Sequence, residues 1–292
     1  MKRCLNCNAR FKSSILDCPS CGWVPKINEG FYMYAPEYCH SDVGFKDGYF
    51  SDLFREEERS FWFRARNQII IWALKKYSPD LSSFLEVGCG TGYVLSGIRD
   101  SFPCAALYGS EIFVSGLRFS AERLEAANLM QMDARNIPYH EEFDVIGAFD
   151  VLEHIKEDGQ VLEQIYNALK IKGIFLVTVP QHKWLWSSVD EHACHVRRYS
   201  ADDLHNKITA AGFHIIRSTS FVSILLPAMM LSRYFQRKNI SESSDASPEF
   251  HISSWMNYTF LKLLELEQAV IKYGIDLPIG GSRLVVAKKI QD

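Results

Sequence analysis

The sequence lacks the features that mark a secreted, membrane-spanning or nucleic-acid-binding protein. No apolar run reaches the roughly 18 residues that a spanning helix needs. The amino-terminal stretch MKRCLNCNAR contains no apolar core of a secretory signal. The net charge is only -3 and the pI is near 6.3, so no overall field would draw the chain to nucleic acid or to an anionic membrane. We therefore expect a cytoplasmic protein.

Two common phosphate-binding signatures and any internal repeat are also missing. The chain has no G-x-x-x-x-G-K-S/T loop. Dinucleotide-binding folds use G-x-G-x-x-G, whereas Gly88, Gly90 and Gly92 form G-x-G-x-G here. Tyr93 stands where the third glycine of that motif would be. This spacing disfavours NAD as a ligand.

Four of the eight cysteines form two C-x-x-C pairs near the amino terminus. Zn²⁺ prefers tetrahedral thiolate ligands, and each pair presents two sulfur atoms to one ion. We therefore expect a zinc ribbon over residues 1–26 whose structural Zn²⁺ supplies its folding energy. A redox pair is the alternative, but it needs one C-x-x-C on a thioredoxin-like unit. The predicted zinc ligands are Cys4, Cys7, Cys18 and Cys21; the remaining cysteines, interpreted as small buried residues or free thiols, are Cys39, Cys89, Cys104 and Cys194.

The rest of the chain predicts an α/β fold. Residues 27–60 are rich in Tyr, Gly and Pro and are interpreted as a linker or flap, while residues 55–77 predict a helix. Strands and helices then alternate, which favours a Rossmann-like, doubly wound sheet of seven mostly parallel strands with helices on both faces. The expected strands are 84–87, 106–110, 129–132, 143–149, 173–179, 214–219 and 283–287. The expected helices between them are 92–101, 113–126, 160–169 and 201–211.

The stretch FLEVGCGTGYVL combines a strand, a glycine-rich turn and the start of a helix. In a doubly wound sheet, such a turn lets the backbone approach a nucleotide without an intervening Cβ. Its E-x-G-x-G-x-G form resembles the class I S-adenosylmethionine (SAM)-dependent methyltransferases, with a quinone-biosynthesis-like branch as the nearest likeness. The resemblance extends over about residues 61–216 and the last strand. It implies a SAM-binding methyltransferase domain over residues 61–292.

The resemblance also implies cofactor contacts in chain order. Glu111, in YGSEI, ends the second strand, where a carboxylate accepts hydrogen bonds from a ribose diol. Asp133, in MQMDARNIPY, lies where the family places an acidic side chain against the adenine amino group. Arg64 and Arg66 point to different faces of the upstream helix, so at most one reaches the cofactor carboxylate. The expected cofactor-binding residues are Glu86, Gly88, Gly90, Gly92, Glu111, Asp133, Ala134 and Asp150.

Methyl transfer depends mainly on alignment, because the sulfonium leaving group needs no protonation. A base helps only where the acceptor is a hydroxyl or a protonated nitrogen. Asp150, Glu153 and His154, in FDVLEHI, follow the fourth strand. In relatives this loop flanks the methionine part of SAM, and in quinone-type O-methyltransferases similar positions are linked to a divalent metal or to proton removal. The alternative is that Glu153 and His154 only cap a helix.

A long loop, VPQHKWLWSSVDEHACHVRRYS, follows the fifth strand. It resembles the H-x-R-R-Y segment of bacterial methyltransferases associated with lipid-linked or polysaccharide pathways. Its histidines are candidate bases and its arginines candidate anchors for a phosphate or carboxylate, with salt bridges inside the fold as the alternative. A zinc site from His192, Cys194 and His195 would have poor spacing. The expected catalytic residues are Asp150, His154, His192 and His195, and the expected substrate-binding residues are Trp184, Trp186, Arg197, Arg198 and Tyr199.

A helical insertion of about residues 220–278 precedes the last strand. It contains the apolar segment FVSILLPAMMLSRYF, a Ser-rich acidic break, ISESSDASPEF, and a second apolar segment, WMNYTFLKLLELEQAVIKYGI. The first segment is too short to span a bilayer. It is interpreted as a helix that covers the active site or, alternatively, as an apolar surface that rests on a membrane or receives a lipid tail. Both interpretations imply a hydrophobic acceptor.

Three functions follow from these observations. The leading one is SAM-dependent transfer of a methyl group to an oxygen or nitrogen of a small, hydrophobic or lipid-linked acceptor, with contact to a membrane surface as a further expectation. The second is an RNA methyltransferase that reads its substrate through the zinc ribbon, which the acidic pI and the lack of Lys/Arg stripes disfavour. The third is a non-catalytic nucleotide-binding module. The oligomeric state is left open.

Overall fold

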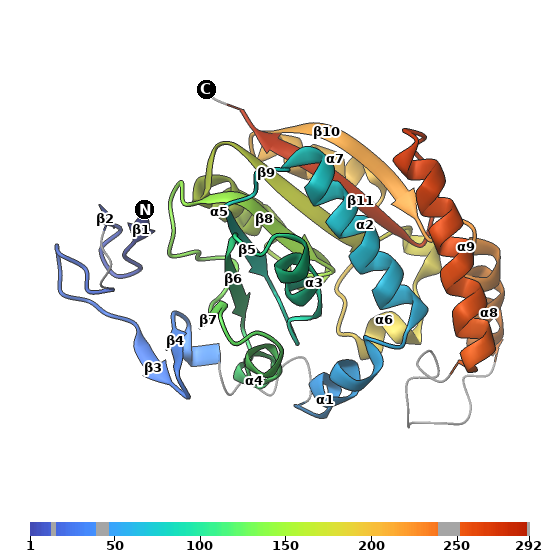
Figure 1. The fold of residues 1–292 in the computed structure, drawn as a ribbon, viewed down its shortest axis with the longest axis horizontal. Helices are drawn as coiled ribbons and strands as arrows, with labels where there is room; N and C mark the ends of the chain where they lie inside the picture. Colours follow the sequence, from blue (N-terminus) through green and yellow to red (C-terminus); the bar gives the residue numbers. More distant parts are fainter. Residues whose placement is uncertain (13–15, 39–46, 239–251, 291–292) are drawn as a thin grey trace.

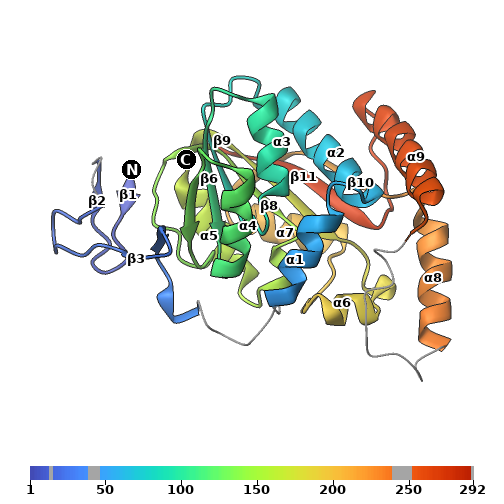
Figure 2. The same ribbon diagram turned by 60° about the horizontal axis from the view of Figure 1, so that its bottom comes forward.

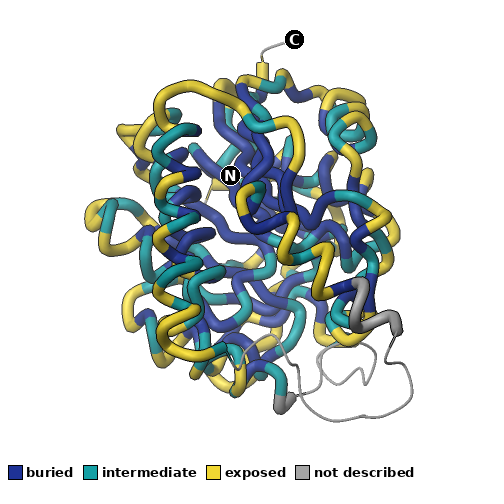
Figure 3. Tube along the Cα trace, turned by 90° about the vertical axis from the view of Figure 1, so that its right-hand side faces the viewer, coloured by how far each residue is buried: buried dark blue, intermediate teal, exposed yellow. Residues whose placement is uncertain are grey.

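The computed structural model describes residues 1–12, 16–38, 47–238 and 252–290 (Figure 1). A twisted sheet runs through the middle of the molecule, and a small amino-terminal unit stands at one of its edges (Figure 2). The buried segments of the chain pass through the interior, and the exposed ones lie outside them (Figure 3). The Ser-rich acidic break expected at residues 240–250 lies outside the described residues.

Within the described residues, the main sheet contains nine strands. They are β3 (Lys26–Asn28), β4 (Phe31–Met33), β5 (Ser83–Val87), β6 (Ala106–Glu111), β7 (Asn128–Gln131), β8 (Phe143–Phe149), β9 (Leu169–Pro180), β10 (Phe213–Phe221) and β11 (Ser282–Lys289). Their order is β10-β11-β9-β8-β5-β6-β7-β4-β3. Neighbouring strands from β9 to β4 pair in parallel, whereas β11 runs antiparallel to both β9 and β10. The chain therefore reverses its winding direction between β5 and β8, where doubly wound sheets bind ligands.

All seven strands expected from the sequence lie in this sheet, so the prediction of a doubly wound α/β fold is confirmed. The expected number of strands is wrong. β3 and β4 come from the segment interpreted as a linker, and β4 pairs in parallel with β7. These strands contain three residues each, which is too short for an alternating apolar pattern to show in the sequence.

Helices cover both faces of the sheet. They are α1 (Asp47–Glu56), α2 (Phe61–Tyr77), α3 (Tyr93–Ser101), α4 (Val114–Arg123), α5 (Asp158–Ala168), α6 (Ser188–His192), α7 (Ala201–Ala210), α8 (Leu226–Lys238) and α9 (Ser254–Lys272). Leu162 of α5 and Leu204 of α7 are buried in one apolar core, whereas Ile70 of α2, Ile98 of α3 and Leu264 of α9 belong to the other. Each such side chain contributes about 1.5–3 kcal/mol by burial. None of the described helices is long and apolar enough to cross a membrane.

The helix expected over residues 55–77 is two helices. α1 ends at Glu56, and α2 begins after Ser60, whose backbone is extended. Next to the interruption, the buried carboxylate of Glu57 pairs with Arg123 of α4 and accepts a hydrogen bond from Thr91.

The amino-terminal unit is attached to the sheet by hydrogen bonds as well as by β4. It contains the two-stranded sheet of β1 (Lys2–Arg3) and β2 (Arg10–Phe11). Arg3 donates to the carbonyl oxygen of Ile137 (2.9 Å) and to the side chain of Gln164 (2.7 Å). Gln131, buried at the end of β7, donates to the carbonyl oxygen of Ala35 (2.6 Å) and accepts from its N–H (2.9 Å). The amino-terminal unit therefore contacts the segment that follows β7 through hydrogen bonds.

Candidate functional site

The glycine-rich turn between β5 and α3 leaves an open cradle at the carboxyl end of the sheet. Gly88, Gly90 and Gly92 adopt left-handed backbone angles, with φ of 70°, 53° and 75°. A Cβ on Gly88 would lie 2.5 Å from the side chain of Val151, so a larger residue would force Val151 to shift. A Cβ on Gly90 would meet no atom within 4 Å. Gly90 therefore faces free space, as the turn of a nucleotide site requires.

Glu111 borders this cradle from the end of β6. Its carboxylate accepts hydrogen bonds from the N–H groups of Gly90 (3.1 Å), Ile112 (2.8 Å) and Phe113 (3.2 Å). Burial raises the pKa of Glu111, and these three N–H groups oppose that shift. The side chain is therefore held in place beside the turn, where a ribose diol would meet it.

The segment after β7 carries the residues expected to contact adenine. Asp133 accepts a hydrogen bond from the N–H of Arg135 (2.8 Å) and pairs with its guanidinium group (2.8 Å). Ala134 is buried beside it. Because β6 and β7 are neighbouring parallel strands, Asp133 and Glu111 both lie at the carboxyl end of the sheet.

Charged groups from three elements meet at the carboxyl ends of β5 and β8. Arg66 of α2 forms an ion pair with Asp150, which follows β8 with a left-handed φ of 57°. The guanidinium group of Arg66 lies 4.6 Å from the ring centre of Trp62. Glu86, in β5, is buried, and one of its carboxylate oxygens has no hydrogen-bond partner within the described part of the chain. Burial raises the pKa of Glu86 to about 8.

Sequence reasoning missed the ion pair between Glu57 and Arg123 beside the glycine turn. Arg123 also donates to the carbonyl oxygens of Phe54 (2.9 Å) and Thr91 (3.3 Å). The pair therefore joins α1, the turn and α4. The two residues are far apart in the sequence and belong to no motif, so only the fold reveals them.

Three candidate residues from two distant segments converge near Asp150. Glu153 and His154 lie on the short helix η2 (Leu152–His154), and His195 follows α6. A carboxylate oxygen of Glu153 and ring nitrogens of His154 and His195 all lie within 4.8 Å of one another, close enough to surround one cation. Burial lowers the pKa of His154 to about 3, whereas burial and the nearby charge of Asp150 raise the pKa of Glu153 well above its usual range. We call these three residues the Glu153 cluster.

Asp190 positions the ring of His195. The Nδ1 atom of His195 is 2.8 Å from a carboxylate oxygen of Asp190, and Nε of Arg198 donates to the same oxygen (2.6 Å). Although burial pushes the pKa of Asp190 upward, the hydrogen bonds from His195 and Arg198 lower it to about 2. Ser187 and Asp190 form a capping box at the start of α6, which fixes the carboxylate in the loop.

Two other residues of the H-x-R-R-Y segment, Arg197 and Tyr199, form hydrogen bonds with Asp158 of α5. Its carboxylate accepts from Arg197 (2.5 Å), from the hydroxyl of Tyr199 (2.6 Å) and from Lys207 (2.9 Å). Tyr199 is fully buried. The salt bridges considered as the alternative for Arg197 and Arg198 are therefore formed, and a contact of these residues with substrate stays a prediction.

The remaining candidates of the loop lie nearer its surface. Trp184 is 48% exposed and stacks on His182, with ring centres 4.9 Å apart. Trp186 donates to Glu191 at 3.4 Å. His192 is exposed, and its Nδ1 lies 2.9 Å from the carbonyl oxygen of Ser188. Within the described residues, His192 does not join His195 in a group of metal ligands.

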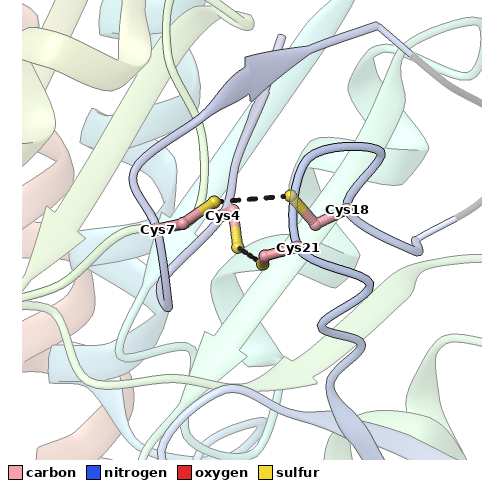
Figure 4. A group of neighbouring side chains, drawn as sticks. All are labelled: Cys4, Cys7, Cys18 and Cys21. Atoms are coloured by element: carbon pink, nitrogen blue, oxygen red, sulfur yellow. Dashed lines mark hydrogen bonds between the residues drawn. The ribbon is translucent and has the colours of Figure 1, made fainter.

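A second group of metal ligands lies in the amino-terminal unit (Figure 4). The sulfur atoms are 3.6 Å apart in each of two pairs, Cys4 with Cys21 and Cys7 with Cys18. Cys4 and Cys18 are buried, whereas Cys7 and Cys21 are exposed. Hydrogen bonding from the backbone of Trp23 lowers the pKa of Cys21 to about 6, which favours a thiolate. These four residues, the cysteine cluster, face one another as ligands of one ion would.

Comparisons of the sequence with known proteins agree with the geometry of the cradle. A family model described as a methyltransferase domain matches residues 54–218. A probable SAM-dependent methyltransferase of Mycolicibacterium smegmatis is 26% identical over 163 residues, which cover 54% of this chain and 61% of that protein. The malonyl-acyl-carrier-protein O-methyltransferase of Bacillus anthracis is 30% identical over 105 residues, which cover 35% of this chain and 39% of that protein. The chain therefore spans less than two thirds of the length of both relatives.

Solved structures share the fold at low sequence identity. Phosphoethanolamine N-methyltransferase 2 of Haemonchus contortus, solved with SAM, has a TM-score of 0.52 at 17% identity, over 83% of this chain and 60% of that one. The cyclase SpnF has a TM-score of 0.53 at 17% identity, over 79% of this chain and 83% of that one. The comparisons confirm the expected SAM-dependent methyltransferase domain, while the quinone-biosynthesis branch stays a prediction.

Proposed function

The chain belongs to the methyltransferase domain family, and from that premise we propose that it transfers the methyl group of SAM to an oxygen or nitrogen of a small, hydrophobic or lipid-linked acceptor. The observation that carries the proposal is the open cradle at Gly90 beside the fixed carboxylate of Glu111, at the point where the sheet reverses its winding. The cradle has the space and the hydrogen-bond acceptor that an adenosine group requires.

SAM supplies a methyl group on a positively charged sulfur. On the protein side, we expect Glu111 and Asp133 to contact the nucleoside, and the ion pair of Arg66 and Asp150 would offer one charge of each sign to the amino-acid end. In the transfer, a lone pair of the acceptor forms a bond to the methyl carbon while the carbon–sulfur bond breaks and its electron pair stays on sulfur. The proton of the acceptor passes to a nearby base or to water. The protein contributes mainly alignment and the exclusion of water.

The proposal of a hydrophobic acceptor is supported by the surface around α8 and α9. Met230 and Leu231 of α8 and Trp255 of α9 are exposed, Trp255 to 73%. Arg233 of α8 donates to Ser187 at the start of α6, which ties this apolar surface to the loop that follows β9. An acceptor with an apolar tail, or a membrane surface that holds one, would contact these side chains.

We assign a structural Zn²⁺ to the cysteine cluster. Four sulfur atoms that face one another in pairs fit a tetrahedral thiolate site, and no disulfide joins the cysteines of the described residues. The unit around them has strands of only two residues, so the ion would supply much of its folding energy.

The test of the acceptor class uses methyl-labelled SAM. The full-length protein is incubated with labelled SAM and a bacterial extract, and the lipid, small-molecule, RNA and protein fractions are separated. We expect label in the lipid or small-molecule fraction. Label in RNA would overturn the proposed acceptor and make the amino-terminal unit a substrate reader.

Binding of SAM is tested separately by calorimetry. Glu111→Ala removes the acceptor of the ribose hydroxyls, so we expect the affinity for SAM to fall at least about tenfold, the equivalent of roughly 1.4 kcal/mol. Glu122→Ala, an exposed carboxylate on α4, is the control and should leave the affinity unchanged. Equal affinity in both variants would refute the ribose assignment.

A further inference from the structure

The segment that follows β7 is bonded to the amino-terminal unit near both of its ends. We call residues 132–140 the Asp133 segment. At its start, the N–H of Tyr34 donates to the carbonyl oxygen that ends β7 (2.8 Å). At its end, the N–H of His140 donates to the carbonyl oxygen of Met1 (2.8 Å), and the amino group of Met1 donates back to that of His140 (2.8 Å). The amino-terminal unit therefore holds the backbone on which the expected adenine contact is carried.

The side chain of Arg3 ties the middle of the Asp133 segment to α5. Its guanidinium group donates to the side chain of Asn136 (2.7 Å), to the carbonyl oxygen of Ile137 (2.9 Å) and to the side chain of Gln164 in α5 (2.7 Å). Its backbone N–H donates to the carbonyl oxygen of Pro138 (2.9 Å). A guanidinium group presents several donors in one rigid plane. One residue of the amino-terminal unit can therefore fix four acceptors at once.

Short contacts connect these acceptors to the carboxylate of Asp133. The N–H of Asn136 donates to the carbonyl oxygen of Asp133 (2.9 Å), which closes a turn. The N–H of Arg135, inside that turn, donates to the carboxylate (2.8 Å). The guanidinium group of Arg135 lies 5.5 Å from the ring centre of Tyr38. A group that binds a ligand must be held in its productive position by its neighbours, and the neighbours of Asp133 contact the amino-terminal unit.

The order of β1 depends on the cysteine cluster. Cys4 directly follows Arg3, and its carbonyl oxygen accepts from the N–H of Asn8 (2.9 Å) in the turn between β1 and β2. Cys4 is buried, whereas Val24 and Ile27 of the same unit are 48% and 64% exposed. Because these apolar side chains form little core, an ion held by the thiolates would order the turn that places Arg3.

We propose that the amino-terminal unit, through Arg3, positions Asp133 for the adenine ring, so that Zn²⁺ in the cysteine cluster and SAM in the cradle bind cooperatively. Arg3 is a positioning residue, because it acts through the Asp133 segment. The inference rests on the proposed function, since it is the adenine ring of SAM that Asp133 would contact. Cooperativity between two ligands is reciprocal, so the factor by which zinc raises the affinity for SAM is also the factor by which SAM raises the affinity for zinc.

Calorimetry on the full-length protein tests the cooperativity without any need for activity. Zinc is removed with a chelator, the chelator is dialysed away, and the binding of SAM to the zinc-free and zinc-loaded forms is compared. We expect zinc removal to weaken the binding of SAM at least about fivefold. Saturating SAM should raise the affinity for zinc by the same factor, as measured by competition with a chromophoric chelator. Equal affinities for SAM in the two forms would overturn the inference.

Arg3→Ala tests the positioning role while the cysteine cluster stays intact. The probes are S-adenosylhomocysteine and S-inosylhomocysteine, in which an oxo group replaces the adenine amino group. A carboxylate accepts a hydrogen bond from the amino group and repels the oxo group, so the wild type should prefer the first probe at least about tenfold. Arg3→Ala should lower this preference at least about threefold. A general loss of stability would weaken the binding of both probes equally, and an unchanged preference would refute the role of Arg3.

Two further variants frame this result. Arg10, which pairs with Arg3 across β1 and β2, is exposed, so Arg10→Ala is the matched control and should bind both probes like the wild type. Asp133→Ala is the positive reference and should abolish the preference between the probes. If Asp133→Ala kept the wild-type preference, Asp133 would not contact the adenine ring, and the inference would fail with that contact.

The same titrations separate this inference from the proposed function. Failure of the zinc-loaded wild type to bind SAM would refute both together. Binding of SAM that depends neither on zinc nor on Arg3 would refute the inference and leave the proposed function in place. Hydrogen exchange without SAM gives an independent readout, because zinc removal should speed exchange in residues 134–140 while β8 stays protected. Unchanged exchange in residues 134–140 would show that the ion does not order the Asp133 segment.

Discussion

The cysteine cluster and the Glu153 cluster are assembled in opposite ways. The thiols come from two C-x-x-C turns that are close in the sequence, on a unit whose strands β1 and β2 have two residues each. The residues of the Glu153 cluster come from segments before α5 and after α6 and are brought together by the apolar core around α5 and α7. Where metal ligands are local, the metal organises the chain, and where side chains are distant, the fold brings them together.

The largest expected effect is the loss of the zinc in Cys18→Ser. This change removes a buried thiolate from a unit with little core of its own, so we expect about one Zn²⁺ per chain to fall to none, with rapid hydrogen exchange in β1 and β2. Elemental analysis and hydrogen exchange measure both effects. Cys104→Ser, at an exposed cysteine outside the cluster, should keep its zinc. Retention of zinc in Cys18→Ser would remove the contrast between the two clusters.

The next effect concerns the support of His195. Asp190→Asn removes the negative charge that pairs with Arg198 and holds Nδ1 of His195, and breaking a buried ion pair costs about 3–5 kcal/mol. Denaturant unfolding measures this loss in the free energy of unfolding. Glu191→Gln, at the exposed neighbouring carboxylate, is the control. An unchanged free energy of unfolding would mean that the pairs of Asp190 with His195 and Arg198 do not stabilise the loop.

The junction between the amino-terminal unit and the sheet gives a smaller effect. Gln131→Ala leaves the N–H of Ala35 without its partner, whereas the carbonyl oxygen of Ala35 keeps the N–H of Tyr38, and a buried unpartnered group costs about 1–3 kcal/mol. We expect the free energy of unfolding to fall by about 2 kcal/mol, with faster hydrogen exchange in β3 and β4. Denaturant unfolding of Gln160→Ala, an exposed glutamine, provides the control. Equal stability of the two variants would show that the contact of Gln131 with Ala35 does not stabilise the fold.

The sequence predicted what local patterns encode. The glycine turn, Glu111 and the C-x-x-C pairs are recognisable because residues within one short segment carry the chemistry. Pairs whose members are far apart could not be predicted in this way, such as Glu57 with Arg123 and Asp158 with Tyr199. The pairing of β4 with β7 could not be predicted either, because β4 pairs with a strand that is far away in the sequence and is exposed for pairing only after the sheet has folded.

The partners of the candidate residues in the long loop could not be predicted from the sequence either. Their types indicated a polar, functional loop, and the three members of H-x-R-R-Y with charged or phenolic groups could have contacted either substrate or protein. The structure pairs Arg198 with Asp190, and Arg197 and Tyr199 with Asp158. Asp190 was not among the expected site residues, because one aspartate in a polar loop carries no signal until its partners are placed.

Glu86 is a second buried carboxylate that can be compared with Glu153. Both side chains are buried with an unpartnered oxygen, but Glu86 belongs to no group of metal ligands within the described residues. We therefore expect Glu86→Gln to change the stability of the protein but not the zinc content of the cysteine cluster, which elemental analysis measures.

The pH dependence of Glu86→Gln follows from burial, which raises the pKa of Glu86 to about 8 from its ordinary 4.5. The folded protein keeps this proton until about pH 8, whereas the unfolded chain releases it near pH 4.5, so the unfolded state gains as the pH rises between these values. Without SAM, this group should lower the free energy of unfolding of the wild type by at most about 1.4 kcal/mol per pH unit in that window. Glu86→Gln removes this slope, so its stability relative to the wild type should increase from pH 5 to pH 8 in denaturant titrations. If the stability of the wild type and of Glu86→Gln changed with pH in the same way, Glu86 would be ionised in the folded protein. Glu86 and Glu153 would then share burial but not a raised pKa.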